Sequence, residues 1–170
     1  MAVVSLTGWY ISMALTKIVS GGQAGVDRAA LDAALAAGFA CGGWCPADRR
    51  AEDGPIPERY PMSLLSDGGD RQRILKNVQE SDGTAILFKQ SLTGGTKQTR
   101  DMCIHEKKPF IVLDATQITV ERASAAILRF IEENEIAVLN VAGPRLSGWP
   151  QGYDFALAAI GGVIAKVAPV

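Results

Sequence analysis

The chain contains few of the residues on which most catalytic and metal sites depend. Its 170 residues include a single histidine and three cysteines. Because Cys41, Cys45 and Cys103 are odd in number and fit no C-x-x-C pattern, neither a disulfide framework nor a zinc site is indicated. We expect small buried thiols, and a surface position for His105. No Ser-His-Asp set and no Cys-His pair is evident, so the sequence offers no ready nucleophile.

A surplus of positive charge is also missing. The 17 Lys and Arg residues are balanced by 18 Asp and Glu residues, for a net charge of -1. Nucleic acid is therefore excluded as the main partner, because a phosphate polymer needs several clustered cations. A small phosphorylated ligand needs only one or two.

Long apolar runs are absent. The longest, residues 3–15, is too short to span a bilayer, has no preceding Lys or Arg and is followed by no cleavage site for a signal peptidase. We therefore expect a cytoplasmic protein with no membrane partner. Residues 1–14 are interpreted as an N-terminal segment outside the main domain. It is a mis-called start, an added strand or an apolar arm that packs on a neighbouring subunit.

Strand-like and helix-like segments alternate over residues 15–170, as is typical of a parallel sheet covered by helices. The predicted strands are 15–20, 39–45, 84–88, 110–113 and 136–141, and the predicted helices are 26–37, 70–80, 96–106, 119–133 and 153–165. Residues 46–62 contain four prolines and predict a long loop. The fold class is therefore α/β, a single Rossmann-like domain with a mainly parallel sheet of about five strands and helices on both faces.

Glycine-rich loops follow two of the predicted strands, and ligands of open parallel sheets bind at the carboxyl ends of the strands. The loop SGGQAGVDR opens a helix, where backbone N–H groups favour an anion. The loop LTGGT repeats this pattern. We expect both to line one pocket, unless each is only a tight strand-to-helix turn. The expected ligand-binding residues of these loops are Gly21, Gly22, Gln23, Gly25, Asp27, Arg28, Thr93, Gly94, Gly95 and Thr96.

Charged residues of two further loops complete the expected site. Arg49 and Arg50 can supply phosphate contacts, and Glu52 and Asp53 can accept hydrogen bonds from a ribose or pterin. Arg145 is the single cation of the turn AGPR. The alternative is a solvated loop whose charges pair with one another. No set of metal ligands is evident.

Six ordered segments carry a resemblance to a known family. They are KIVSGGQAGVDRAALDAAL, GWCPADRRAEDGPIPERYP, NVQESDGTAIL, LTGGT, KKPFIVLD and LNVAGPR. Over residues 15–147 the chain resembles the proposed molybdenum cofactor carrier proteins, a branch of the lysine-decarboxylase-like Rossmann superfamily. This resemblance implies a Rossmann-like fold, a homo-oligomer such as a dimer or tetramer, and a pocket for a phosphorylated pterin or nucleotide-like anion. Molybdenum cofactor would then be cargo.

One departure bears on enzymatic activity. Superfamily relatives that cleave nucleoside monophosphates carry P-G-G-x-G-T-x-x-E with an essential glutamate, whereas this chain has LTGGTKQT, with Thr99 at the expected acid position. A binding or carrier protein is therefore favoured over an enzyme. The alternatives are a phosphoribohydrolase-like enzyme that uses Glu52 or Asp53, and a sensor of a nucleotide-derived signal.

Self-association is expected from two features. The first predicted helix presents an alanine-rich surface, and the N-terminal segment is apolar, with no charge before Lys17. Such surfaces are commonly covered by a second subunit.

Overall fold

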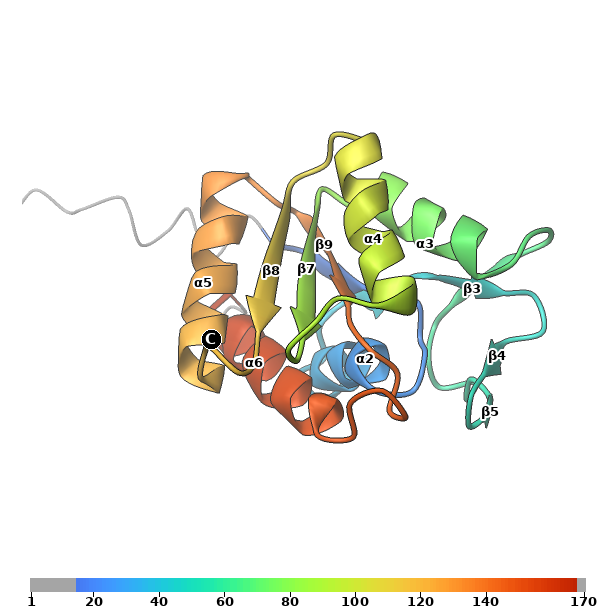
Figure 1. The fold of residues 1–170 in the computed structure, drawn as a ribbon, viewed down its shortest axis with the longest axis horizontal. Coiled ribbons are helices and arrows are strands. Elements are labelled where there is room, and N and C mark those ends of the chain that lie inside the picture. The colour runs from blue at the N-terminus through green and yellow to red at the C-terminus, as the bar shows by residue number, and fades with distance from the viewer. Residues whose placement is uncertain (1–14, 168–170) are drawn as a thin grey trace, which may run out of the picture.

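A computed structural model describes residues 15–167 of the chain. Its centre is a five-stranded parallel sheet in the order β2-β1-β9-β7-β8 (Figure 1). The strands of this sheet are β1 (Lys17–Val19), β2 (Cys41–Gly42), β7 (Gly83–Phe88), β8 (Phe110–Asp114) and β9 (Val138–Ala142). The expected five-stranded parallel sheet is thus confirmed.

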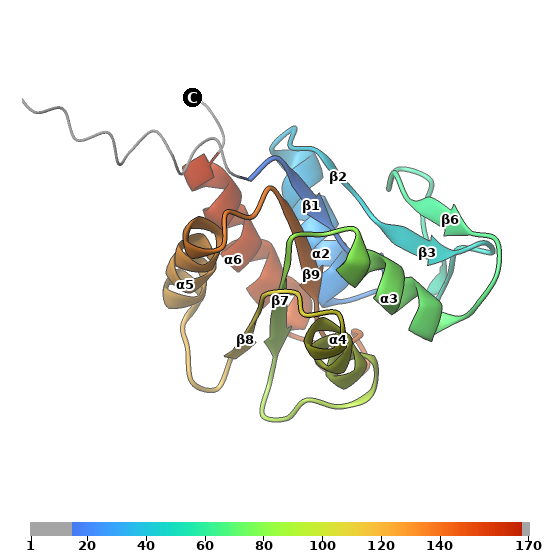
Figure 2. The ribbon, with the colours of Figure 1, turned by 90° about the horizontal axis from the view of Figure 1, so that it is seen from above.

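Five helices cover the two faces of this sheet. Figures 1 and 2 show α2, α5 and α6 on one face and α3 with α4 on the other. Their bounds are α2 (Val26–Ala36), α3 (Asp70–Gln79), α4 (Gly94–His105), α5 (Val120–Glu133) and α6 (Gly152–Val167). The helices lie close to their predicted positions. Apolar residues of α2, α5 and α6 form one continuous core with the sheet, and Ile74 and Val78 of α3 are buried as well.

The position of β9 determines where a ligand can enter. Although β9 is the last strand in the chain, it lies between β1 and β7, with Ile18 opposite Leu139 and Thr84 opposite Asn140. The helices that follow β1 and β7 leave for opposite faces of the sheet. A crevice therefore opens at the carboxyl ends of these three strands, as the strand-order rule for parallel sheets requires.

The alanine-rich surface of α2 is covered within the chain. Ala30, Ala33 and Ala34 are buried, and α6 packs along α2. The expectation that this surface meets a second subunit is wrong, because a helix of the same chain already covers it. The apolar arm lies in residues 1–14, outside the described residues. Self-association through that arm stays a prediction, which light scattering can test.

The segment from 39 to 65 differs from the expected strand and loop. Gly43, with φ of 134°, divides the predicted strand, and a Cβ there would lie 1.9 Å from the Ser20 carbonyl oxygen. The chain then leaves the main sheet as β3 (Trp44–Pro46), which pairs with β6 (Ser63–Leu65). Between them, β4 (Arg50–Ala51) and β5 (Gly54–Pro55) form a small hairpin.

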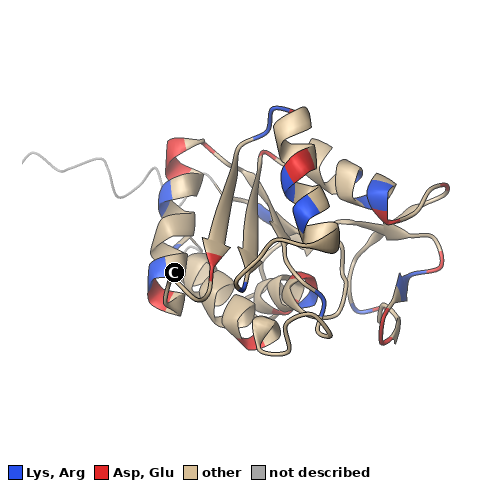
Figure 3. Cartoon of the chain, in the orientation of Figure 1, with Lys and Arg blue, Asp and Glu red and all other residues tan. Residues whose placement is uncertain are grey.

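Charged residues of both signs are interspersed over the helices and loops (Figure 3), in keeping with the net charge of -1. Within residues 15–167, no helix is long and apolar enough to cross a membrane.

Candidate functional site

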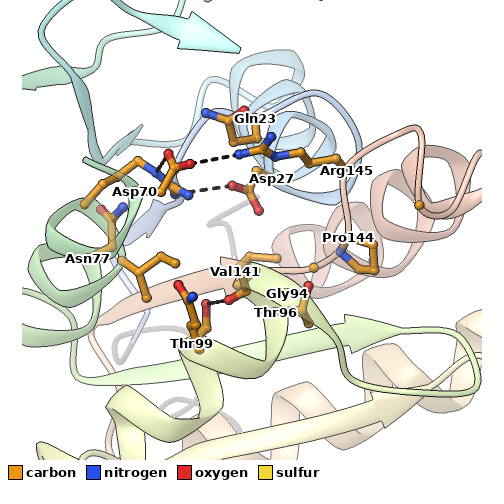
Figure 4. Close-up of a pocket in the computed structure, with 18 of the residues that line it drawn as sticks. Gln23, Asp27, Asp70, Asn77, Gly94, Thr96, Thr99, Val141, Pro144 and Arg145 are labelled. Carbon is orange, nitrogen blue, oxygen red and sulfur yellow. Dashed lines mark hydrogen bonds and ion pairs between the residues drawn. The ribbon is translucent and has the colours of Figure 1, made fainter. Parts of the chain in front are cut away.

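A cavity of about 420 Å³ lies at the carboxyl ends of β1, β7 and β9 (Figure 4). Its walls come from the loop after β1, from α3, from the start of α4 and from the loop after β9. Polar side chains dominate the lining, namely those of Gln23, Asp27, Asp70, Arg73, Asn77, Thr93, Thr96, Gln98, Thr99, Asn140, Arg145 and Ser147. Gly94 and Gly95 also line the cavity.

The N-terminus of α4 forms one wall. Its N-cap residue, Thr93, provides no side-chain hydrogen bond to the helix, so backbone N–H groups of the first turn stay available to a ligand. Gly94 has φ of 52°, a conformation that glycine adopts without strain. Thr96 is buried, and no hydrogen bond to another described residue uses its hydroxyl. Free backbone N–H groups at a helix N-terminus favour an anion, and this wall of the cavity provides them.

Asp27, Asp70 and Arg145 lie on the opposite wall (Figure 4), and Arg73 lines the cavity close to both carboxylates. An Arg73 guanidinium nitrogen lies 3.9 Å from an Asp27 carboxylate oxygen, and both side chains are buried. Arg73 Nε lies 3.6 Å from Asp70, whose other oxygen accepts a hydrogen bond of 3.1 Å from Arg145. The wall therefore carries two positive and two negative charges. Its Asp70 and Arg145 side chains remain partly exposed.

Arg73 fits into this wall because residue 21 is a glycine. A Cβ on Gly21 would lie 1.8 Å from Arg73 Nη1 and 2.9 Å from an Asp27 oxygen. The sequence pattern predicts that Gly21 lets the backbone approach a ligand. The structure shows instead that the space beside it holds the guanidinium group.

Burial raises the pKa of Asp27 from 3.8 to about 6. Loss of hydration is the largest cause, while Arg73, backbone hydrogen bonds to Gln23 and Gly143, and Arg145 lower the pKa. The positive charges thus compensate only part of the cost of burying the carboxylate. Strongly perturbed groups in a cavity are candidates for function.

The structure brings many of the expected site residues together. Those that line the cavity come from both glycine-rich loops and from the AGPR turn, and they are Gly21, Gln23, Asp27, Thr93, Gly94, Gly95, Thr96 and Arg145. The remaining expected residues lie outside this lining: Gly22, Gly25, Arg28, Arg49, Arg50, Glu52 and Asp53.

Gly22 and Gly25 serve the turn between β1 and α2. Gly22 has φ of 73° and Gly25 has φ of 114°. A Cβ on Gly25 would lie 2.7 Å from the Pro144 carbonyl oxygen, so the glycine permits close packing of the turn after β9. Gly22 and Gly25 were expected to line the cavity, but they lie in this turn and outside the lining.

The two arginines of the long loop do not reach the cavity. Arg49 donates hydrogen bonds to the carbonyl oxygens of Ile56 at 2.8 Å, Pro57 at 2.7 Å and Tyr60 at 3.1 Å. Arg50 is exposed and lies 3.9 Å from Asp48. Arg49 therefore holds the loop in place, and Arg50 is directed to solvent.

The two acids proposed for the alternative enzyme are also engaged elsewhere. Asp53 forms a bidentate ion pair with Arg28, which lowers the pKa of Asp53. Glu52 accepts hydrogen bonds from the Ser147 backbone N–H at 3.0 Å and hydroxyl at 2.6 Å, which lower its pKa. Both contacts attach the β4–β5 hairpin to the domain.

Sequence reasoning missed the α3 wall. Asp70, Arg73 and Asn77 recur at spacings of three and four, on the helix face that also carries the buried Ile74 and Val78. Polar residues within an apolar helical stripe are the signal that could have found them, because such residues need partners inside the protein. Asn77, for example, accepts from the Trp44 backbone N–H at 2.8 Å.

A cavity at the carboxyl ends of a parallel sheet, with a glycine-rich helix N-terminus in its wall, is typical of a Rossmann-like ligand-binding domain. The chain belongs to the circularly permutated YpsA SLOG family, which matches residues 18–164. The crystal structure of a proposed molybdenum carrier protein from Syntrophus aciditrophicus SB is similar, with 38% sequence identity and a TM-score of 0.86. This similarity covers 89% of the present chain and 96% of the other. A comparison with curated proteins gives no match.

Metal ligands are not clustered in the part of the chain that the structure describes. Residues 15–167 contain no group of three His, Cys, Asp or Glu side chains placed to hold a metal ion. The polar walls of the cavity instead provide backbone N–H groups, guanidinium groups and carboxylates.

Proposed function

We propose that the cavity binds a small phosphorylated heterocycle, either a phosphorylated pterin such as molybdenum cofactor or a nucleotide-like anion. One observation carries this proposal: the N-terminus of α4 faces the cavity opposite a wall of charged side chains (Figure 4). One end of the cavity thus suits an anion and the other suits a polar ring. The similarity to a proposed molybdenum carrier supports the pterin as cargo.

The phosphate would occupy the α4 end. Backbone N–H groups of Gly95 and Thr96, together with the Thr96 hydroxyl, can donate to phosphate oxygens, and the helix dipole favours negative charge there. Arg145 lines the same cavity and is 45% exposed, so its guanidinium can turn from Asp70 toward a ligand. Arg73 is buried and would act mainly through its charge.

Titration calorimetry with GMP and with 6-hydroxymethylpterin monophosphate tests the proposal. We expect at least one to bind, and its affinity to fall with added salt. Arg145→Ala should weaken binding about tenfold to hundredfold, the loss of one charge-assisted hydrogen bond. Arg50→Ala is the matched control, because Arg50 is exposed and lies outside the cavity. Equal losses in the two variants, or no binding of either compound, would contradict the proposal.

Mass spectrometry of small molecules released from the denatured protein would identify the cargo. A phosphorylated pterin supports a carrier of molybdenum cofactor, and a nucleotide supports the nucleotide-like alternative, including a sensor of such a signal. Arg145→Ala protein should release less of either compound than Arg50→Ala protein.

A second candidate, a hydrolase of N-glycosidic bonds, is favoured by Asp27. Its carboxyl lines the cavity and has a pKa of about 6, near the value that suits a general acid at neutral pH. Asp27 takes the catalytic role that the sequence suggested for Glu52 or Asp53, because neither of those two residues lines the cavity. Incubation with nucleoside monophosphates and measurement of base release separates the candidates. Release that disappears in Asp27→Asn supports the enzyme, and retention without release supports the carrier.

A further inference from the structure

Two hydrogen-bond acceptors of the cavity have lone pairs that no side chain of the protein uses. Gln23 is 4% exposed, and its Oε1 atom is buried without a hydrogen-bond partner. Its Nε2 group donates to the Arg50 carbonyl oxygen at 3.1 Å, which fixes the orientation of the amide. The Oε1 atom is therefore an unpaired acceptor on a residue that lines the cavity.

Asp27 provides the second acceptor. Its nearest cation, Arg73, lies 3.9 Å away, which is too long for a hydrogen bond. The backbone N–H groups of Gln23 and Gly143 donate to the Asp27 carboxylate, but among residues 15–167 no side chain does. A buried carboxylate whose lone pairs are only partly used is costly, and donors from a ligand would lower that cost.

These acceptors lie across the cavity from the anion site. Figure 4 shows Gln23 and Asp27 on one wall, with Gly94 and Thr96 on the opposite wall. A ligand that spans the cavity with its phosphate at α4 would therefore present its other end to Asp27 and Gln23. That end has to carry hydrogen-bond donors.

We infer that the Asp27 end of the cavity selects the 2-amino-4-oxo pyrimidine edge that guanine and pterins share. This inference rests on the proposed function. The edge presents an N–H and an adjacent NH₂ group, and the two oxygens of a carboxylate accept from both at once. The second N–H of the amino group is available to Gln23 Oε1. Adenine and hypoxanthine lack this pair of donors, so they bind more weakly.

Calorimetry with GMP, IMP and XMP isolates the amino group, because hypoxanthine lacks it and xanthine carries a carbonyl in its place. We expect GMP to bind at least tenfold more tightly than IMP, and XMP to bind more weakly than GMP. In Asp27→Asn the amide offers one acceptor and one donor, so the preference for GMP over IMP should fall at least fivefold and XMP should gain relative to GMP. A parallel series compares 6-hydroxymethylpterin monophosphate with the lumazine analogue, which also has a carbonyl for the amino group. Tighter binding of GMP would identify the ligand as a guanine nucleotide, and tighter binding of the pterin monophosphate would identify it as a pterin.

Asp70→Asn is the matched control. Asp70 lines the same cavity and contacts the same arginine, but it pairs with Arg73 and Arg145. This variant should keep the wild-type preference for GMP over IMP and over XMP, even if all three affinities change. Gln23→Leu provides a second test that retains the carboxylate, and it should reduce the preference for GMP by a smaller factor.

Equal affinity for GMP and IMP, together with equal affinity for the pterin and its lumazine analogue, would overturn the inference and leave the proposed function intact. A ratio of GMP to IMP affinity that is the same in Asp27→Asn as in the wild type would overturn it as well. Failure of every phosphorylated compound to bind would overturn the proposed function and this inference together.

Discussion

Arg73 lies directly over Gly21, with Nη1 only 1.8 Å from the point that a Cβ atom of residue 21 would occupy. The contact places a buried guanidinium group beside the Asp27 carboxylate and joins α3 to the loop after β1. A glycine of a predicted ligand-binding loop can thus make room for a side chain of the protein instead of a ligand. The relation between residues 21 and 73 shapes the wall of the cavity.

Gly21→Ala should destabilise the protein by about 1 to 3 kcal/mol, the usual cost of forcing extra volume into a packed site. Arg73 would have to move away from Asp27, and the pKa of Asp27 would rise further because Arg73 lowers it in the wild type. Urea unfolding measures the change in stability. Gly161→Ala is the control, since a Cβ there meets nothing within 4 Å. It lies within α6, where alanine is the better helix former, so it should be neutral or stabilising.

The raised pKa of Asp27 predicts a specific pH dependence of stability. A carboxyl whose pKa is about 6 when folded and 3.8 when unfolded binds its proton more tightly in the folded state, so its contribution to stability increases as the pH falls from 7 toward 4. Asp27→Asn removes this titration. The variant should be more stable than the wild type by about 2 to 3 kcal/mol at pH 8, and the difference should disappear near pH 4. Urea unfolding across this pH range measures the difference, and a constant offset would contradict the account.

Arg49 and Arg50 should behave differently although they are adjacent. Arg49→Ala removes hydrogen bonds to three backbone carbonyl oxygens, and the expected loss of stability is about 1.5 to 3 kcal/mol. Arg50→Ala should change stability by less than about 0.5 kcal/mol, because the side chain is exposed. Thermal unfolding of both variants provides the measurement. Similar losses would show that the loop is held in another way.

The order of elements could be predicted because it depends on local patterns. Apolar residues at helical spacing identify α2 and α5, and short apolar runs identify β7 and β8. The pairing of β3 with β6 could not be predicted in this way. It depends on Gly43, whose backbone passes against Ser20, a residue distant in sequence.

The candidate site is predictable at its two glycine-rich loops and at Arg145 of the AGPR turn, which all line the cavity. Gly94, Gly95 and Thr96 could be predicted because they lie between a predicted strand and a predicted helix. Ligands of parallel sheets bind at such strand ends and helix N-termini. The partner of a charged side chain, by contrast, depends on the folded chain, so the sequence pattern assigns Arg49 and Arg50 to phosphate. Arg73 escapes prediction because its role depends on the juxtaposition of α3 with the loop after β1.

We propose that the phosphate of the ligand binds at the N-terminus of α4. Calorimetry on GMP and guanosine, with wild type, Thr96→Val and Lys97→Ala, tests this claim through the coupling between the phosphate and the Thr96 hydroxyl. Lys97 is the control because it is exposed on the same helix turn and lies outside the cavity lining. We predict that GMP binds at least tenfold more tightly than guanosine to the wild type and to Lys97→Ala. In Thr96→Val this ratio should fall severalfold, because the variant lacks one hydrogen bond to the phosphate. Equal binding of GMP and guanosine by the wild type, or the same phosphate dependence in Thr96→Val, would contradict it.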